Sequence, residues 1–135
     1  MKIEWKEEYS VGVKKIDEQH KKMLSLVSKL KEILYEVDNT DSIKSLIQEL
    51  VDYGRYHFDT EENYFEQTNY PDKLIHQSYH NDYNEKILEF QNKFSEEKTI
   101  KIAFEISDFL EEWWITHIKY EDMKYVDWFK KHDIS

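Results

Sequence analysis

The segment IDEQHKKMLSLVSKLKEILYEV, residues 16–37, carries the pattern that decides the fold. Six apolar side chains and one histidine follow one another in it at alternating intervals of four and three residues: Ile16, His20, Met23, Val27, Leu30, Leu34 and Val37. This spacing places every member on one face of an α-helix, here called a seam, and is typical of helices packed nearly antiparallel in a bundle.

Three later segments repeat the spacing. The second seam is Ile43, Ile47, Leu50, Gly54, His57, Glu61 and Tyr64. The third is His76, His80, Tyr83, Ile87, Phe90 and Phe94. The fourth is Ala103, Ile106, Leu110, Trp113 and His117.

The chain has few residues that interrupt helices. It contains two glycines and one proline, and the breaks fall at 38–41, 68–72 and 95–99. Short connections between long helices favour an all-α, up-down-up-down antiparallel four-helix bundle. We predict one domain over residues 1–135, with an arm at 1–15, helices at about 16–37, 41–67, 72–95 and 99–118, and a C-terminal tail at 119–135.

Composition excludes several classes of function. The formal net charge of −10 disfavours nucleic acid and anionic membranes as partners, because both are bound mainly through Lys and Arg. The chain has no cysteine, which rules out disulfides and thiolate metal sites. We see no signal peptide and no membrane span, so we expect a soluble cytoplasmic protein. Polar outer helix faces favour a monomer.

Polar residues on the seams, where apolar residues are expected, indicate a functional site. Five of the six histidines lie there, together with Glu61: His20, His57, His76, His80 and His117. A buried carboxylate is costly without a cationic partner, and a buried histidine must at least be hydrogen-bonded. One such histidine is best explained as a satisfied core residue, but five distributed over four seams are not. The sixth, His132, lies off every seam and is expected to be solvated.

Depth along the bundle brings these residues together. His20 precedes a turn at Asn39 by 19 residues and His57 follows it by 18, so both lie about 27–28 Å from that turn. The same count around the second and third turns makes Glu61 level with His76, and His80 level with His117. All of them therefore converge on one layer of the bundle.

Asp122 is a further candidate. It lies five residues after His117, about 140° away on an unbroken helix, and reaches the layer only if the helix ends or unwinds at residues 117–119. Spacing alone leaves a metal ligand and a solvated aspartate equally open.

The donor set narrows the choice of metal. Five imidazoles exceed what one tetrahedral zinc takes up, and calcium and magnesium prefer oxygen ligands. Imidazole with carboxylate suits iron, and also manganese, zinc or copper. The number of ligands fits two metals bridged by both carboxylates, with one coordination position left for solvent or a small molecule.

Four short motifs carry a family resemblance. The series IDEQHKKM at 16–23, HFDTEE at 57–62, HQSYH at 76–80 and HIKYED at 117–122 resembles the hemerythrin family in its single-domain bacterial form. The arm WKEEYSVGVKKID at 5–17 is similar to the segment that leads into the first helix of that family.

The resemblance implies a di-iron centre with an oxo or hydroxo bridge. It implies that His76, His80 and His117 bind one iron and that His20 and His57 bind the other. Glu61 and Asp122 would bridge the two ions, which decides the open question on Asp122. The implied function is reversible dioxygen binding, in storage, transport or buffering, and not enzymatic catalysis.

Apolar neighbours of these ligands are candidates for the wall of an O2 pocket. They are adjacent to a ligand or one helical turn away: Leu24, Phe58, Trp113, Trp114 and Ile118. For any single aromatic residue among them, ordinary core packing is the favoured explanation.

Two alternatives to reversible O2 binding remain. An open di-iron site could act as an oxidase or peroxidase, which requires an acid–base group beside it. The seams offer no carboxylate or histidine beyond the seven ligands, although Tyr53, Tyr64 and Tyr83 could supply protons. The third possibility is an O2 or redox sensor that acts through a partner protein.

Overall fold

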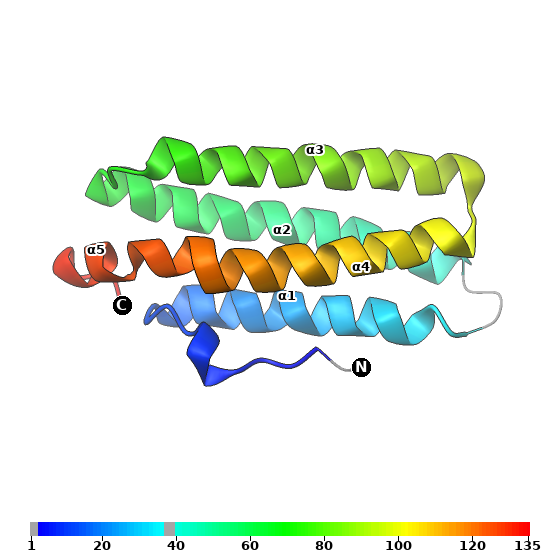
Figure 1. Cartoon of the computed structure of the whole chain (residues 1–135), viewed down its shortest axis with the longest axis horizontal. Coiled ribbons are helices and arrows are strands. Elements are labelled where there is room, and N and C mark those ends of the chain that lie inside the picture. Colours follow the sequence, from blue (N-terminus) through cyan, green and yellow to red (C-terminus); the bar gives the residue numbers. More distant parts are fainter. Residues whose placement is uncertain (1–2, 37–39) are drawn as a thin grey trace.

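The computed structural model describes residues 3–36 and 40–135, and four long helices dominate it (Figure 1). They are α1 (Lys14–Ile33), α2 (Thr40–Thr68), α3 (Lys73–Glu97) and α4 (Ile100–Thr116). Shorter elements are the 3₁₀ turn η1 (Glu7–Tyr9), the π-helical turn η2 (His117–Glu121), the 3₁₀ turn η3 (Asp122–Tyr125) and helix α5 (Val126–Lys131).

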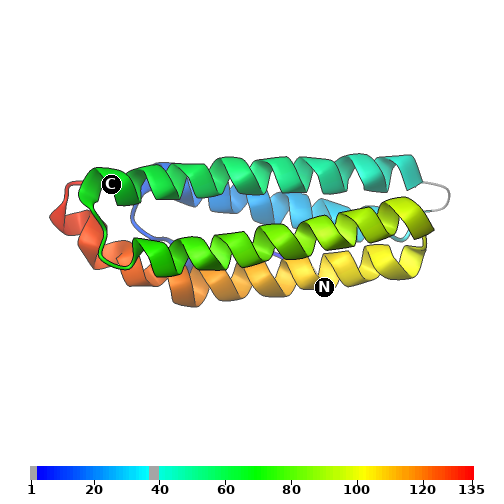
Figure 2. The same ribbon diagram turned by 90° about the horizontal axis from the view of Figure 1, so that it is seen from above.

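The four long helices run side by side with consecutive helices in opposite directions (Figures 1 and 2). Contacts join α1 to α2, α2 to α3, α3 to α4, and α4 back to α1, so the bundle closes on itself. This confirms the predicted up-down-up-down four-helix bundle. The predicted first turn at Asn39 and the end of the first seam at Val37 lie outside the described residues.

The seams form the core of the bundle. Ile16, Met23, Val27 and Leu30 are fully buried along α1, and the other seams are buried in the same way with three exceptions. The first is Phe90 on α3, which is partly exposed. On α4 the structure buries Trp114 and leaves Trp113 partly exposed. An α-helix has 3.6 residues per turn, so a seam with a 3.5-residue period drifts around the helix, which places Trp114 and not Trp113 in the core.

The last exception is at the end of α2, where Phe65 is fully buried and the predicted seam residue Tyr64 is only partly buried. Phe65 belongs to a small apolar cluster that closes this end of the bundle: Val11, Val13, Ile16, Phe65, Tyr70, Tyr125 and Phe129. A larger cluster fills the rest of the bundle.

The C-terminal segment differs from the prediction, which gave residues 119–135 as a tail. The chain continues from α4 through η2 and η3 into α5, and Tyr125 and Phe129 are fully buried. Their rings stack with centroids 4.4 Å apart, and Phe129 contacts Phe65 at 5.9 Å. Burial of these aromatic side chains stabilises the helical segment, and the prediction missed it because the four seams end before it.

The N-terminal arm lies along the bundle, mainly beside α1 (Figure 1). Asp17 anchors it by accepting hydrogen bonds from Ser10 Oγ (2.6 Å) and the Val11 amide (2.9 Å), while Ser28 Oγ donates to the Ile3 carbonyl (2.8 Å). No helix among the described residues is long and apolar enough to span a membrane.

Candidate metal centre

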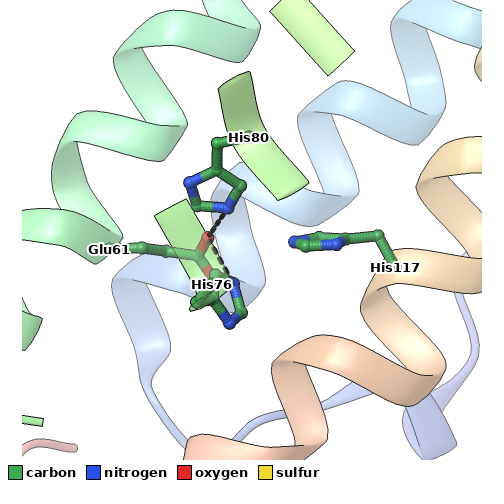
Figure 3. Close-up of side chains that lie close together, drawn as sticks. All are labelled: Glu61, His76, His80 and His117. Carbon is green, nitrogen blue, oxygen red and sulfur yellow. Dashed lines mark ion pairs between the residues drawn. The ribbon is translucent and has the colours of Figure 1, made fainter. Parts of the chain in front are cut away.

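Helices α1, α2 and α3 and the two turns after α4 contribute side chains to one buried polar layer. His20 comes from α1, His57 and Glu61 from α2, His76 and His80 from α3, and His117 and Asp122 from η2 and η3. Each of the seven is at most 4% exposed. Figure 3 shows His117 reaching toward Glu61, His76 and His80 from the side opposite to them.

The donor atoms form two overlapping groups, each within a 4.8 Å span. One group is Glu61, His76, His80 and His117, and the other is His20, His57, Glu61 and Asp122. Glu61 belongs to both because its Oε1 lies 3.5 Å from His57 Nε2 and 3.2 Å from His80 Nε2.

Asp122 faces both groups with different oxygens. Its Oδ2 lies 3.0 Å from His20 Nε2, while its Oδ1 lies 3.0 Å from His76 Nε2 and 3.1 Å from His117 Nε2. A carboxylate that presents one oxygen to each of two donor groups has the arrangement of a bridging ligand.

The π-helical turn η2 brings Asp122 to this position. The Asp122 amide donates to the His117 carbonyl five residues earlier, so the turn holds one residue more than an α-helical turn. Residues five apart then share a face, which satisfies the condition that the helix must unwind after His117.

Several polar atoms of this layer lack hydrogen bonds. Eight buried side-chain atoms in the described part of the chain have no hydrogen-bond partner, and all but Ser107 Oγ belong to the candidate ligands. They include Nε2 of His76, His80 and His117, both Asp122 oxygens and Glu61 Oε1. Buried polar atoms are rarely left without a partner, and atoms that lie close together without hydrogen-bonding fit the donor set of bound metal ions.

The pKa shifts in the layer also fit a cation site. Burial raises the pKa of Asp122, but His117, His20 and His76 outweigh this effect and hold the pKa well below its usual value. Burial lowers the pKa of His76, but Asp122 and Glu61 outweigh it and raise that pKa to about 10. The layer therefore contains ionised carboxylates that stabilise positive charge between them, as a cation site does.

The fold and this geometry agree with comparisons to known proteins. Residues 11–129 match the family model described as the hemerythrin HHE cation binding domain. The chain belongs to the hemerythrin family.

Curated relatives in this family cover nearly the whole chain. A bacteriohemerythrin of Clostridium acetobutylicum is 32% identical over 126 residues, which is 91% of this chain and 98% of the relative. A hemerythrin-like protein of Naegleria gruberi is 33% identical over 121 residues, or 90% and 88% of the two chains. A bacteriohemerythrin of Stenotrophomonas maltophilia is 27% identical over 128 residues, or 95% and 82%.

Gln19 supports one candidate ligand of this layer and was missed from the sequence. Its Oε1 accepts from His57 Nδ1 at 2.7 Å, and its Nε2 donates to Thr60 Oγ1 at 3.0 Å. Burial lowers the pKa of His57 to about 3, so the ring is neutral and its single proton lies on Nδ1. His57 Nε2 consequently presents a lone pair to the centre.

Glu62 and Tyr125 support two other members of the layer. Glu62 Oε2 accepts from His80 Nδ1 at 2.9 Å, which orients the His80 ring. The Tyr125 hydroxyl donates to Glu61 Oε2 and leaves Oε1 to face the histidines. The sequence signal for Gln19 and Glu62 was their position next to the ligands His20 and Glu61; Tyr125 had none.

Aromatic rings surround the ligands. Phe58 stacks on His80 with centroids 3.9 Å apart, Trp114 lies 5.7 Å from His57, and Trp113 stacks on His117 at 4.3 Å. Leu24 and Ile118 are fully buried in the same large apolar cluster as Phe58 and Trp114. Four of the five pocket candidates thus lie in the core, and Trp113 is partly exposed.

Proposed function

We propose that the seven polar residues bind two iron ions and that this centre binds dioxygen reversibly. His76, His80 and His117 hold one ion, His20 and His57 hold the other, and Glu61 and Asp122 bridge them. The observation that carries the proposal is the position of Asp122, whose two oxygens face the two histidine groups at 3.0–3.1 Å.

The donor chemistry supports iron. Imidazole and carboxylate together suit iron, and the absence of thiolates removes the usual ligands of structural zinc. Two iron(II) ions in such a site supply the electrons that dioxygen takes up when it binds. The proposal gives three histidines to one ion and two to the other, so the ion held by His20 and His57 would have fewer protein donors and would have room for a small molecule.

The apolar side chains around the site keep water out. Phe58, Trp114, Leu24 and Ile118 are at most 2% exposed. Reversible binding of O2 requires such a wall, because water and stray protons would convert the bound gas to products. This wall lies beside His57 and His80, whose rings contact Trp114 and Phe58.

The tyrosines near the site favour binding over catalysis. Burial raises the pKa of Tyr125 well above its usual value, and the neighbouring Asp122 and Glu61 raise it further. Burial also raises the pKa of Tyr83, whose hydroxyl accepts from Trp114 Nε1 at 3.1 Å. Both phenols hold their protons at neutral pH and are poor acids, whereas a di-iron oxidase or peroxidase needs a ready proton donor.

An optical titration tests this function. Purified protein is loaded with Fe(II) without oxygen, and we expect about two irons per chain. Admitting O2 should produce visible absorption that fades when the gas is removed. The His132→Ala variant, which alters an exposed histidine stacked on Trp128, should behave identically.

Two results would contradict the proposal. Irreversible oxidation at the first exposure to O2 would favour an enzyme or a sensor. Binding of fewer than two irons would reject the centre itself.

A further inference from the structure

A cavity of about 370 Å³ lies between α3 and the end of α4. Its lining includes Tyr79, Phe109, Glu112, Trp113, His117 and Glu121. His117 links it to the metal centre, because this side chain lines the cavity while its unpartnered Nε2 faces Asp122 Oδ1 at 3.1 Å.

The centre comes closest to solvent on this side. His76 and His117 are 4% and 3% exposed, whereas His20, His57, Glu61 and Asp122 are all 0% exposed. The Tyr79 ring lines the cavity beside both histidines, with its centroid 6.4 Å from that of His76 and 6.3 Å from that of His117.

Two carboxylates flank this side of the centre. Glu112 and Thr116 are four residues apart on one helical face, and Glu121 follows His117 by the same interval. Glu121 Oε2 accepts from Lys124 at 3.0 Å, and its other oxygen is free of that contact. These residues do not form a third group of three or more converging metal donors among the described residues.

We infer that this cavity is the route by which divalent cations reach the centre, with Glu112 and Glu121 drawing the hydrated ion to His117. The inference rests on the proposed function, since it concerns the loading of the same site. His117 would be the first ligand to bind the ion, because it belongs to both the cavity and the centre.

The physical need for a route is specific to the metal. Dioxygen is small and apolar and can cross a packed core through side-chain fluctuations, but a divalent cation must exchange its water shell for protein ligands step by step. Crossing the apolar wall beside His57 would leave the ion without such ligands, which is very costly. Carboxylates at the mouth of a cavity replace the first waters and also raise the local concentration of cations.

The experiment compares two variants of equal charge. Glu112→Gln with Glu121→Gln removes the two carboxylates of the cavity, and Glu49→Gln with Glu89→Gln removes two exposed carboxylates from α2 and α3. The rate of Co(II) uptake by metal-free protein is followed by stopped-flow absorbance, and the number of bound ions by equilibrium titration.

We expect the cavity variant to take up Co(II) about three to ten times more slowly than the control variant, with two ions bound at equilibrium in both. A Tyr79→Ala variant should take up the ion faster than the native chain. Equal rates in the two double variants, with two ions bound, would overturn the route and leave the proposed function intact. Failure of the native chain to bind Co(II) would overturn both.

Discussion

At the scale of single residues, side chains just outside the ligand set decide how the ligands present themselves. Gln19 is 4% exposed and uses both ends of its amide, one on His57 and one on Thr60. Without it, the His57 ring could rotate or move its proton to the nitrogen that faces the centre.

The first prediction concerns Gln19. Gln19→Leu removes the acceptor for His57 Nδ1 and should weaken binding of one of the two metal ions by about 10- to 100-fold. Gln19→Glu restores an acceptor and should restore most of the affinity. Calorimetric titration of metal-free protein with Zn(II) measures both, and identical isotherms for Gln19→Leu and the native chain would refute this role.

The second prediction concerns Tyr70. Burial raises the pKa of Tyr70 to about 12, with Asp72, Asp122 and Glu121 adding to the shift. The unfolded chain ionises near pH 10 while the folded chain keeps the proton, so the free energy of unfolding falls as the pH rises from about 10 to 12.

Tyr70→Phe removes this contribution. Urea unfolding at a series of pH values should show a shallower alkaline loss of stability in the variant than in the native chain. Tyr125 and Tyr83 ionise late in both proteins and cancel in the comparison. Parallel alkaline curves would show that Tyr70 does not titrate in this way.

The candidate ligands could be predicted from the sequence because most of them occupy seam positions. A histidine at a seam position interrupts the apolar pattern, and the number of residues between it and the nearest turn gives its position along the bundle axis. The structure brings all seven together, and their role as ligands stays a prediction. Gln19 and Glu62 are adjacent to candidate ligands, but their roles could not be predicted because they depend on ring orientations that adjacency does not determine.

At the scale of helices, α2 contains a glycine at its centre. Gly54 makes room for Trp114, but a Cβ placed on it would lie 3.6 Å from both Trp114 and Tyr83 and 3.7 Å from Met23, which are ordinary contacts. Its backbone is helical, so alanine fits without strain.

The third prediction is that Gly54→Ala stabilises the protein. Alanine favours a helix over glycine by about 0.5–1 kcal/mol, and the added methyl group fills a packed site without a clash. Thermal and urea unfolding of the metal-free protein should both show the gain. A loss of stability would mean that the methyl group does not fit beside Trp114 and Tyr83.

The fourth prediction concerns the π-helical turn η2, which holds one residue more than an α-helical turn. Deleting exposed Lys119 would make Asp122 the fourth residue after His117, which keeps both on one face of a regular α-helix. The deletion variant should still bind two metal ions.

An insertion serves as the opposite control. One alanine added after Lys119 would rotate Asp122 away from the layer and should lower the number of bound ions. Equal metal binding by the deletion and insertion variants would show that η2 does not determine the position of Asp122.

The four long helices could be predicted from the seams, but the helical segment that follows α4 could not. The 4-3 spacing predicted four helices and their antiparallel order because apolar burial is the main driving force for bundles. The sequence identified the need for an unwound turn after His117 but not the helix that follows it. Tyr125 and Phe129 pack on Phe65 at the end of the bundle, a contact between distant segments that no local pattern reveals.

At the scale of the whole molecule, the polar layer divides the core in two. Phe58 and Trp114 belong to the large apolar cluster on one side, and Phe65 and Tyr125 belong to the small cluster on the other. Each set of rings contacts a histidine of the layer, Phe58 contacting His80 and Phe65 contacting His76. Without metal, this layer is a cluster of buried charged side chains, several of whose atoms lack hydrogen bonds, and it weakens the core.

The last prediction follows from this division of the core. Metal that binds only the folded chain stabilises it by mass action, by about 2.7 kcal/mol when the free ion is at 100 times its dissociation constant. The thermal midpoint should therefore rise as Fe(II) or Zn(II) is added and fall again with a chelator, as followed by circular dichroism.

A variant with His76→Ala and His80→Ala separates site binding from a general effect of cations on an acidic chain. It loses two donors of one group, so metal should raise its midpoint far less than that of the native chain, although both keep the formal charge of −10. An equal rise in both proteins would mean that cations act by screening the negative surface. The polar layer would then bind no metal and would only destabilise the fold. A rise confined to the native chain would mean that the same ions that serve the proposed function also hold the four helices together.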